Sequence, residues 1–121
     1  MQKRPGLKVI QPTLKEKKRY LVYSTSSFGS SAPSAGALQK GIEQGMLEFL
    51  GDNGYSKAGI MFIKGTGKKG IMRIDRSAVD DVRTGLMTIT SIQRQPVTIT
   101  CVGLSGTIAN ATKTYTSHGG E

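Results

Sequence analysis

The sequence is poor in the side chains that carry enzyme chemistry, since its 121 residues include one cysteine, one histidine and no tryptophan. Cys101 has no second cysteine for a disulfide, and it lies in the alternating stretch 97–102, which favours a small buried residue. His118 lies in a Thr-, Ser- and Gly-rich tail. One Cys and one His so placed cannot form a zinc site or a nucleophile–base pair. The sequence therefore predicts a chain that holds no metal or cofactor itself and catalyses nothing alone.

Long apolar runs are also absent. No uninterrupted apolar stretch exceeds the four residues of 60–63, whereas a membrane-spanning helix needs about 20. Lys3, Arg4 and Lys8 have no apolar segment behind them, unlike the charged start of a secretory signal peptide. We therefore expect a cytoplasmic protein with no membrane partner.

Acidic residues are scarce relative to basic ones. Eight Asp and Glu accompany 17 Lys and Arg, which gives a formal net charge of +9. On a chain short enough to form one domain, this imbalance creates a strong positive potential that attracts polyanions. Nucleic acid is therefore the first partner to consider.

The basic residues are concentrated near the N-terminus. Residues 1–19 hold seven of the 17 cations and a single acid, and Pro5, Gly6 and Pro12 break any helix there. We expect a flexible basic arm at 1–13, one domain at 14–111 and a flexible tail at 112–121.

The first predicted helix follows a Ser-, Gly- and Pro-rich loop at 28–34. Ser34 can cap it and the glycines of 51–54 can end it. Its apolar stripe is Leu38, Ile42, Met46, Phe49 and Leu50. Gly41 and Gly45 each cost such a helix about 1 kcal/mol relative to Ala. We predict that a partner chain approaches closely at both, with tolerated surface glycine as the equal alternative.

The remaining segments predict a second helix and a set of strands. The expected strands are residues 20–23, 59–64, 70–75 and 97–102. Ser77, with Asp80 three residues later, is expected to cap the second helix. Its apolar stripe is Val79, Val82, Leu86 and Ile89. Ser105 is expected to cap a short helical turn that ends at Ala111.

The predicted order is β-α-β-β-α-β with a short appendage. This order is typical of the α+β ferredoxin-like sandwich, in which both helices pack on one face of an antiparallel sheet. The other face stays open, as in RNA-recognition domains that bind single-stranded RNA.

Gly65, Gly67 and Gly70 match the G-x-G-x-x-G spacing of phosphate-binding loops. A dinucleotide fold needs a helix directly after such a loop, but residues 71–75 predict a strand. The glycines are therefore interpreted as part of a tight, mobile hairpin that leaves its cations accessible to RNA phosphates.

Strand alternation predicts which side chains face that RNA. We expect Met61, Ile63, Met72 and Ile74 to pack toward the helices, and Ile60, Phe62, Lys64, Ile71, Arg73 and Asp75 to lie on the open face. Phe62 would stack on a base, although a register shift of one residue would bury it instead. The predicted RNA-binding residues are Lys15, Lys17, Lys18, Arg19, Phe62, Lys64, Lys68, Lys69, Arg73 and Arg76.

Four stretches resemble one known family. They are L-K-E-K-K-R-Y-L-V-Y at 14–23, A-G-I-M-F-I-K at 58–64, K-G-I-M-R-I-D-R at 69–76 with V-D-D-V-R at 79–83, and V-G-L-S-G-T-I at 102–108. In order and spacing they are similar to archaeal ribonuclease P protein component 2, the counterpart of the eukaryotic Pop-five subunit.

The resemblance implies a non-catalytic subunit of the ribonucleoprotein that removes 5′ leaders from precursor tRNA. The implied partners are ribonuclease P RNA, which is the catalyst and holds Mg2+, precursor tRNA, protein component 3, and a second copy in a heterotetramer. The family's basic strand residues correspond to Lys18, Arg19, Lys64, Arg73 and Arg76. The sequence departs from the family at Ala109 and Asn110, where relatives place a basic residue.

Two alternatives remain. A ribosomal or other small RNA-binding protein of the same topology would bind its RNA without a second protein. An acylphosphatase-like enzyme would need an Arg and an Asn around a phosphate loop near the first strand, and residues 24–34 contain neither.

Overall fold

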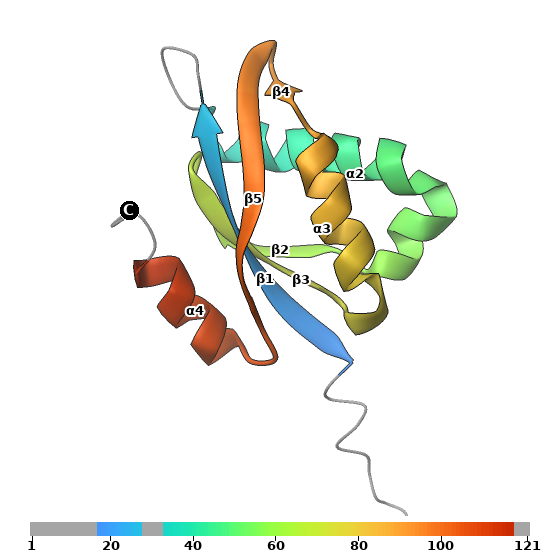
Figure 1. Ribbon diagram of the computed structural model, residues 1–121, viewed down its shortest axis with the longest axis vertical. Coiled ribbons are helices and arrows are strands. Elements are labelled where there is room, and N and C mark those ends of the chain that lie inside the picture. The colour runs from blue at the N-terminus through green and yellow to red at the C-terminus, as the bar shows by residue number, and fades with distance from the viewer. Residues whose placement is uncertain (1–16, 28–32, 118–121) are drawn as a thin grey trace, which may run out of the picture.

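The chain forms a five-stranded antiparallel sheet with the strand order β2-β3-β1-β5-β4 (Figure 1). The computed structural model describes residues 17–27 and 33–117. The expected basic arm at 1–13, Lys15 and His118 lie outside the described residues. The elements are β1 (Lys18–Ser27), α2 (Ala35–Ala58), β2 (Met61–Gly65), β3 (Lys69–Asp75), a 3-10 turn (Arg76–Ala78), α3 (Val79–Thr88), β4 (Ser91–Ile92), β5 (Gln95–Ser105) and α4 (Ile108–Ser117).

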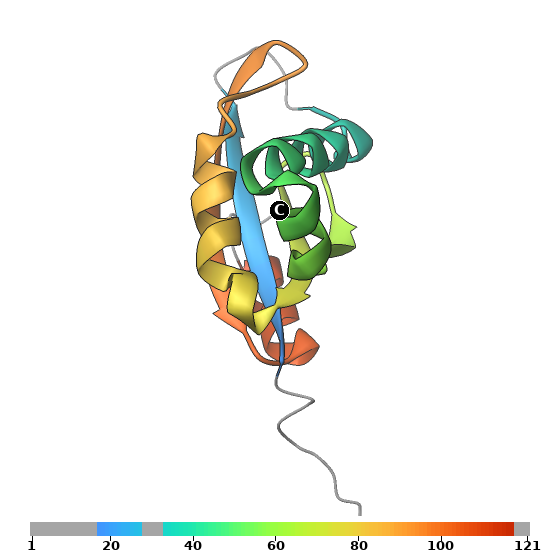
Figure 2. The ribbon, with the colours of Figure 1, turned by 90° about the vertical axis from the view of Figure 1, so that its right-hand side faces the viewer.

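The predicted α+β, ferredoxin-like order is confirmed, with β4 and a longer α4 added to it. Helices α2 and α3 pack on one face of the sheet, and their apolar stripes meet inward-facing strand residues in the main core (Figure 2). Fully buried members of this core include Leu21, Leu38, Ile42, Met46, Met72, Ile74, Val82 and Leu86. Each such side chain contributes about 1.5–3 kcal/mol through the hydrophobic effect, so this layer holds the sheet and the two helices together.

Helix α2 begins as predicted and ends later. Ser34 Oγ accepts a hydrogen bond from the backbone N–H of Ala37 at 3.1 Å, which confirms the cap. Gly51 has φ 78°, which interrupts the helix, but the chain resumes helical geometry and ends only at Gly59. The predicted stop at 51–54 is therefore confirmed at Gly51 for the first helical segment, whereas the second segment that follows it was not expected. Phe49 is 42% exposed, so Leu50 rather than Phe49 completes the buried stripe.

The structure gives Gly41 and Gly45 a role within the chain itself. A β-carbon at Gly45 would lie 2.5 Å from Ile89 Cγ1, and one at Gly41 would lie 2.8 Å from Ile92 Cδ1. The absence of a side chain at these two positions therefore lets the segment that joins α3 to β5 pack closely against α2. Packing within the chain was not among the two alternatives considered for these glycines, and the approach of a partner chain stays a prediction.

The capping residue of the second helical segment is Asp75 rather than Ser77. The Asp75 carboxylate accepts hydrogen bonds from the backbone N–H of Ser77, at 3.0 Å, and from its hydroxyl. These bonds shape the 3-10 turn, and α3 then starts at Val79 without a side-chain cap. The predicted stripe is confirmed, because Val82, Leu86 and Ile89 are buried and Val79 packs against the core.

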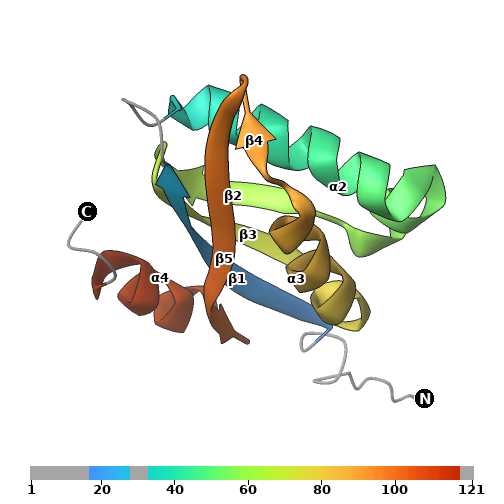
Figure 3. The same ribbon diagram turned by 45° about the horizontal axis from the view of Figure 1, so that its top comes forward.

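The second face of the sheet is only partly open. Helix α4 lies on the opposite side of the sheet from α2 and α3 (Figure 2 and Figure 3). Its Ala111 and Tyr115 pack against Val22 and Ile71 in a second apolar cluster. Helix α4 continues to Ser117, so the expected flexible tail is wrong for residues 112–117.

The start of α4 also differs from the expectation. Thr107 Oγ1 accepts a hydrogen bond from the backbone N–H of Asn110 at 3.2 Å, whereas Ser105 Oγ accepts one from the N–H of Thr107. Ser105 therefore orders the preceding turn, and Thr107 is the residue that caps the helix.

Candidate nucleic-acid interface

Met61, Phe62 and Ile63 of strand β2 face the opposite sides from those predicted, whereas Lys64 lies on the predicted side. Phe62 lies beside Met72 in the sheet and packs against the main core, whereas Met61 and Ile63 are 47% and 39% exposed. Phe62 is therefore not a base-stacking residue on the open face. The strand register shifts between Phe62 and Lys64, so Lys64 lies beside Ile71 on the face that carries α4.

The three glycines of the G-x-G-x-x-G match are explained by close packing. A β-carbon at Gly70 would collide with Tyr23 Oη, and one at Gly65 would lie 3.2 Å from the same atom. A β-carbon at Gly67 would overlap the carbonyl oxygen of Pro33. Since Gly67 and Gly70 are required by neighbours in the same chain and Gly65 is closely packed, the motif needs no nucleotide to account for it.

Hydrogen bonds fix the turn between β2 and β3 in place. The N–H of Thr25 donates to the carbonyl oxygen of Lys68 at 2.7 Å, and the Thr25 hydroxyl lies 3.2 Å from that of Gly67. The N–H of Thr66 donates to Lys69 O at 2.7 Å. Bonds from β1 thus hold this turn, contrary to the expectation of a mobile edge.

The first group of predicted cations is the turn cluster, which consists of Lys64, Lys68 and Lys69. Lys69 is only 2% exposed, and its Nζ donates to the carbonyl oxygen of Tyr115 at 2.6 Å. The same Nζ lies 4.6 Å from the centre of the Tyr115 ring, and Lys64 Nζ lies 5.1 Å from it. Lys69 therefore holds the last turn of α4, and its expected accessibility is wrong. Lys68 is exposed.

The second group is the sheet-end cluster, formed where β1 begins and β3 ends. Its members are Lys17, Lys18, Arg19, Arg73 and Arg76. The backbone N–H of Arg76 donates to the carbonyl oxygen of Lys17 at 2.6 Å, which joins the two segments. Lys18 Nζ lies 3.9 Å from Asp75 Oδ1. The hydrogen bonds from Ser77, with Lys18 and Lys17 nearby, hold the pKa of the Asp75 carboxyl below its ordinary value.

Arg73 differs from the other cations of its cluster. It is half-buried on the face that carries α4, opposite Tyr20 of β1 and Met61 of β2. Its Nε is fully buried and has no hydrogen-bond partner among the described residues. Among the described residues, Arg73 is the one whose side chain has a buried polar atom without a hydrogen-bond partner. Burying an unpaired donor of a charged group costs about 1–3 kcal/mol or more.

Tyr20 is a residue that the sequence reasoning missed. It lies directly opposite Arg73 and packs at the border of the α4 cluster. Tyr23, three residues later on the other face, is buried among apolar side chains, and this burial raises its pKa to about 12. The alternation of β1 could have separated the two rings, because Tyr20 and Val22 share one face and Leu21 and Tyr23 the other.

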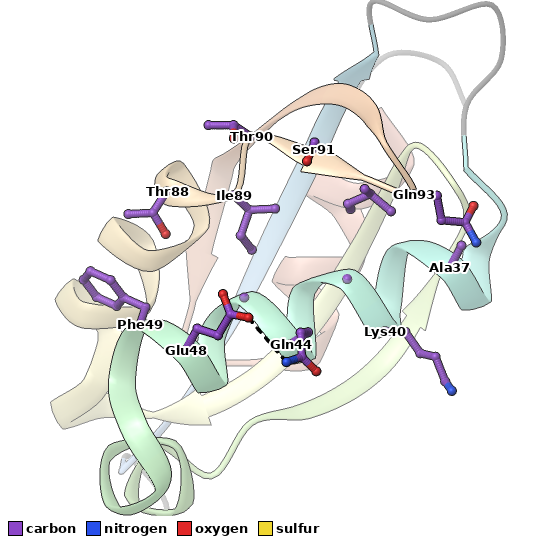
Figure 4. Close-up of a pocket in the computed structure, with 13 residues that line it drawn as sticks. Ala37, Lys40, Gln44, Glu48, Phe49, Thr88, Ile89, Thr90, Ser91 and Gln93 are labelled. Carbon is purple, nitrogen blue, oxygen red and sulfur yellow. Dashed lines mark hydrogen bonds between the residues drawn. The ribbon is translucent and has the colours of Figure 1, made fainter.

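A groove of about 730 Å3 lies on the helical side, between α2 and residues 88–93 (Figure 4). Gly41 and Gly45 line it, together with Phe49 and the side chains of Gln44 and Glu48. Gln44 Nε2 donates to Glu48 Oε2 at 3.4 Å along the helix. None of the residues that line the groove belongs to either cation cluster.

The described residues contain neither a metal-binding cluster nor a membrane-spanning helix. No three or more His, Cys, Asp or Glu side chains gather there in a way that could hold a metal ion. No described helix is long and apolar enough to cross a membrane.

Comparison with known proteins gives a consistent family. The Rpp14/Pop5 family model matches residues 15–116. A protein named ribonuclease P protein component 2 from Methanocaldococcus jannaschii is 36% identical, over 87% of this chain and 77% of that protein. The protein of the same name from Pyrococcus furiosus is 33% identical, over 99% of this chain and 98% of its own length.

A solved structure supports the fold. A chain in the cryo-EM structure of yeast ribonuclease MRP superposes with a TM-score of 0.64 and covers 76% of both chains. Its sequence identity is 16%, so this likeness bears on the fold alone.

Proposed function

The chain belongs to the Rpp14/Pop5 family, and from this membership we propose that it acts in ribonuclease P as the protein subunit for which its archaeal relatives are named. In this role it binds the RNA of the particle and supports removal of 5′ leaders from precursor tRNA. Catalysis and the Mg2+ ions belong to the RNA. The chain contributes binding and positioning.

The observation that carries this proposal is the sheet-end cluster. Four of its five cations have at least partly exposed side chains at the ends of two neighbouring strands, and the fifth, Arg73, lies half-buried between them. Asp75 is the one acid on these strands, and it is already bonded to Ser77. Such a group of cations suits the phosphate backbone of a folded RNA.

The turn cluster contributes less. We assign Lys68 to RNA phosphates because it is exposed, and Lys64 because its ammonium lies at the edge of the α4 cluster. Lys69 is assigned to the support of α4. Along β3, Lys69 and Arg73 are four residues and therefore roughly 13 Å apart, and the exposed Lys68 and Arg76 at the two outer ends are roughly 25 Å apart.

The protein partners are component 3 and a second copy of the chain. The surface proposed for one of these contacts is the groove beside α2. Its wall carries Phe49, a large apolar side chain left half-exposed, and its floor is shaped by Gly41 and Gly45. Exposed aromatic side chains at such a groove are typical anchors for protein partners.

The test is reconstitution of precursor-tRNA cleavage from ribonuclease P RNA, a component 3 protein and this chain at fixed Mg2+. We expect the chain to increase cleavage only when the RNA is present. The key variant replaces Lys17, Lys18 and Arg76 with Gln. Its matched control removes the same charge from exposed positions outside both clusters and outside the groove, through Lys57, Arg83 and Arg94 to Gln.

The two triple variants separate a specific surface from general charge. Loss of about three phosphate contacts should flatten the log–log salt dependence of RNA binding by roughly 2–3 units in the first variant and leave the control slope unchanged. Equal behaviour of both variants would mean that net charge alone attracts the RNA. Full binding and cleavage without component 3 would favour the alternative of a small independent RNA-binding protein.

A further inference from the structure

We propose that the outer face of α4 binds the minor groove of a double-stranded segment of RNA, while the two cation clusters bind the phosphates on either side of that groove. This inference rests on the proposed function, since it specifies how the chain contacts RNA. It gives a binding surface to a helix that contributes no residue to the predicted RNA-binding set. It also specifies paired rather than single-stranded RNA.

Helix α4 has one face that the fold does not use. The helix packs on the sheet through Ala111, its one buried residue, and through Tyr115. Because an α-helix has 3.6 residues per turn, a set of exposed residues lies on the opposite side. This outer face consists of Ala109, Asn110, Lys113, Thr116 and Ser117. No other described element covers this side of α4 (Figure 1 and Figure 3).

The outer face of α4 is small, polar and free of negative charge. Helix α4 contains no Asp or Glu, and Lys113 is its single cation. The side-chain amide of Asn110 and the hydroxyl of Thr116 form no hydrogen bond with a described residue. Both groups can donate and accept hydrogen bonds. They are therefore available to a ligand that also donates and accepts, such as the 2′-hydroxyl of a ribose.

The two cation clusters lie at the two ends of α4. Near its start, a β-carbon at Gly106 would lie 4.0 Å from Nη1 of Arg19, which belongs to the sheet-end cluster. Near its end, Nζ of Lys64, which belongs to the turn cluster, lies 5.1 Å from the centre of the Tyr115 ring. The ten residues of α4 span about 15 Å. A nearly neutral helix thus lies between two groups of cations.

This arrangement fits an RNA duplex better than a single strand. The minor groove of A-form RNA is wide and shallow, displays 2′-hydroxyls, and has a phosphate backbone along each side. The outer face of α4 meets the hydroxyls, and exposed cations beyond both of its ends reach the two backbones. Single-stranded RNA is bound by stacking on exposed aromatic rings. The described rings on this side of the sheet, Tyr20 and Tyr115, pack instead against the apolar cluster beneath α4.

The distribution of acidic residues directs RNA to the same side. Five of the six described acids belong to α2 and α3, on the other face of the sheet: Glu43, Glu48, Asp52, Asp80 and Asp81. The sixth, Asp75, accepts hydrogen bonds from Ser77 and lies beside Lys18. A polyanion is therefore repelled from the side of α2 and α3 and attracted to the side of α4.

The experiment measures the affinity of the full chain over a salt series for three probes of equal length. The probes are an RNA duplex, a DNA duplex of the same sequence and single-stranded RNA. The variants are the double substitution Asn110→Ala with Thr116→Ala, and Lys113→Gln. Their matched controls are Thr84→Ala and Arg83→Gln, at exposed positions on α3.

The parent chain should prefer the RNA duplex to both other probes by about tenfold. The Asn110 and Thr116 double variant should bind the RNA duplex about tenfold more weakly with an unchanged salt slope, because it loses neutral hydrogen bonds. Its affinity for the DNA duplex should change by less than about twofold, since DNA has no 2′-hydroxyl. Lys113→Gln should flatten the salt slope by roughly 0.7–0.9. Both controls should bind like the parent chain.

A stability measurement separates this proposal from a purely structural role of α4. Ala has a higher helix propensity than Asn or Thr, so the double variant should keep or raise the thermal midpoint of the free chain while it binds the RNA duplex more weakly. A changed midpoint with unchanged affinity for the RNA duplex would overturn the proposal. Rare openings of α4 leave the affinity unchanged, because the apparent Kd depends on the fraction of chains in the binding-competent form.

The proposed function fails in a distinguishable way. If the parent chain binds single-stranded RNA more tightly than the duplex, or if the α4 variants bind every probe like the parent chain, the assignment of α4 is wrong and the chain still binds RNA. If the parent chain binds no probe and does not stimulate reconstituted cleavage, the proposed function and the assignment of α4 are both wrong.

Discussion

One face of one sheet carries cations in two different surroundings. At the turn end, Lys69 lies beneath α4 with its ammonium bonded to a carbonyl oxygen and facing an aromatic ring. At the other end of the same strand, Arg73 has a buried nitrogen without a described partner. The first cation already has its ligands within the chain, whereas the second still lacks one.

This difference shows that charge and strand position do not by themselves make a binding residue. Lys69 and Arg73 point to the same face of β3, since they are four residues apart in a strand. What separates them is the hydrogen bonding, because Lys69 Nζ donates to a carbonyl oxygen of α4, whereas no described residue accepts a hydrogen bond from Arg73 Nε. Substitutions near the two cations, and alkaline pH, test this difference.

Gly70→Ala should reduce the stability of the fold more than any other change, through the end of the sheet that α4 covers. The added β-carbon would collide with Tyr23 Oη and lie 2.9 Å from the carbonyl oxygen of Lys64, in a site where neither neighbour can move freely. We expect a loss of about 3 kcal/mol or more in the free energy of unfolding, measured with urea. Gly36→Ala is the control, because nothing lies within 4 Å of its β-carbon, and it should stabilise α2 slightly.

Alkaline pH should weaken the same region through Tyr23. Its pKa is raised to about 12 by burial and by Tyr115, against 10.0 in the unfolded chain. Below pH 10 both states keep the proton and stability is unaffected. Between pH 10 and 12 the unfolded chain ionises first, so stability falls with rising pH by about 2–3 kcal/mol.

Urea unfolding at steps from pH 8 to pH 12 measures this loss. Lysines also titrate in this range, so the informative quantity is the difference between the parent chain and Tyr23→Phe. The variant should lack the Tyr23 contribution. Parallel curves for the two proteins would show that Tyr23 ionises as easily in the folded chain as in the unfolded one.

Lys69→Met should loosen α4 while leaving RNA binding unchanged. The substitution keeps the buried stem and removes the hydrogen bond to Tyr115 O, which costs about 1.5–3 kcal/mol for a charged donor. Faster amide exchange in α4 and an unchanged salt slope of RNA binding are the expected results. A slope flattened by about one unit would contradict the assignment of Lys69 to α4.

Lys68→Gln should have the smallest effect on the fold and the opposite signature. Its side chain is exposed, and its hydrogen bonds to Thr25 and Thr66 are made by backbone atoms, which the substitution keeps. Stability should change by less than about 0.5 kcal/mol, and the salt slope should flatten by roughly 0.7–0.9. Of these two adjacent residues, Lys68 would then bind RNA and Lys69 would support α4.

The order of elements could be predicted from the sequence, but the faces of β2 could not. Residues 60–63 are all apolar, so alternation gives no sign of which side is buried. The register shift near Ile63 removes the remaining cue. Phe62 was therefore assigned to the wrong face, whereas the stripe of α3, with polar residues between its apolar positions, was predicted correctly.

Helix α4 and the two α2 glycines were misjudged for a different reason. The sequence of α4 is rich in Thr, Asn and Ser, which have low helix propensity, and its stability comes from Ala111, Tyr115 and Lys69. Gly41 and Gly45 likewise depend on isoleucines more than 40 residues away. Contacts between residues so far apart in the sequence cannot be predicted from a local sequence pattern.

The central place of β1 in the sheet has a consequence for how the protein is made. Strand β1 pairs with β3 on one side and with β5 on the other, and β5 ends at Ser105. A ribosome adds about 5–20 residues per second, so the first strand waits several seconds for its second neighbour. During that time the edge of β1 that later meets β5 is unpaired, and a chaperone or another nascent chain could occupy it. The last strand to be synthesised therefore closes the sheet, and α4 then covers the finished face.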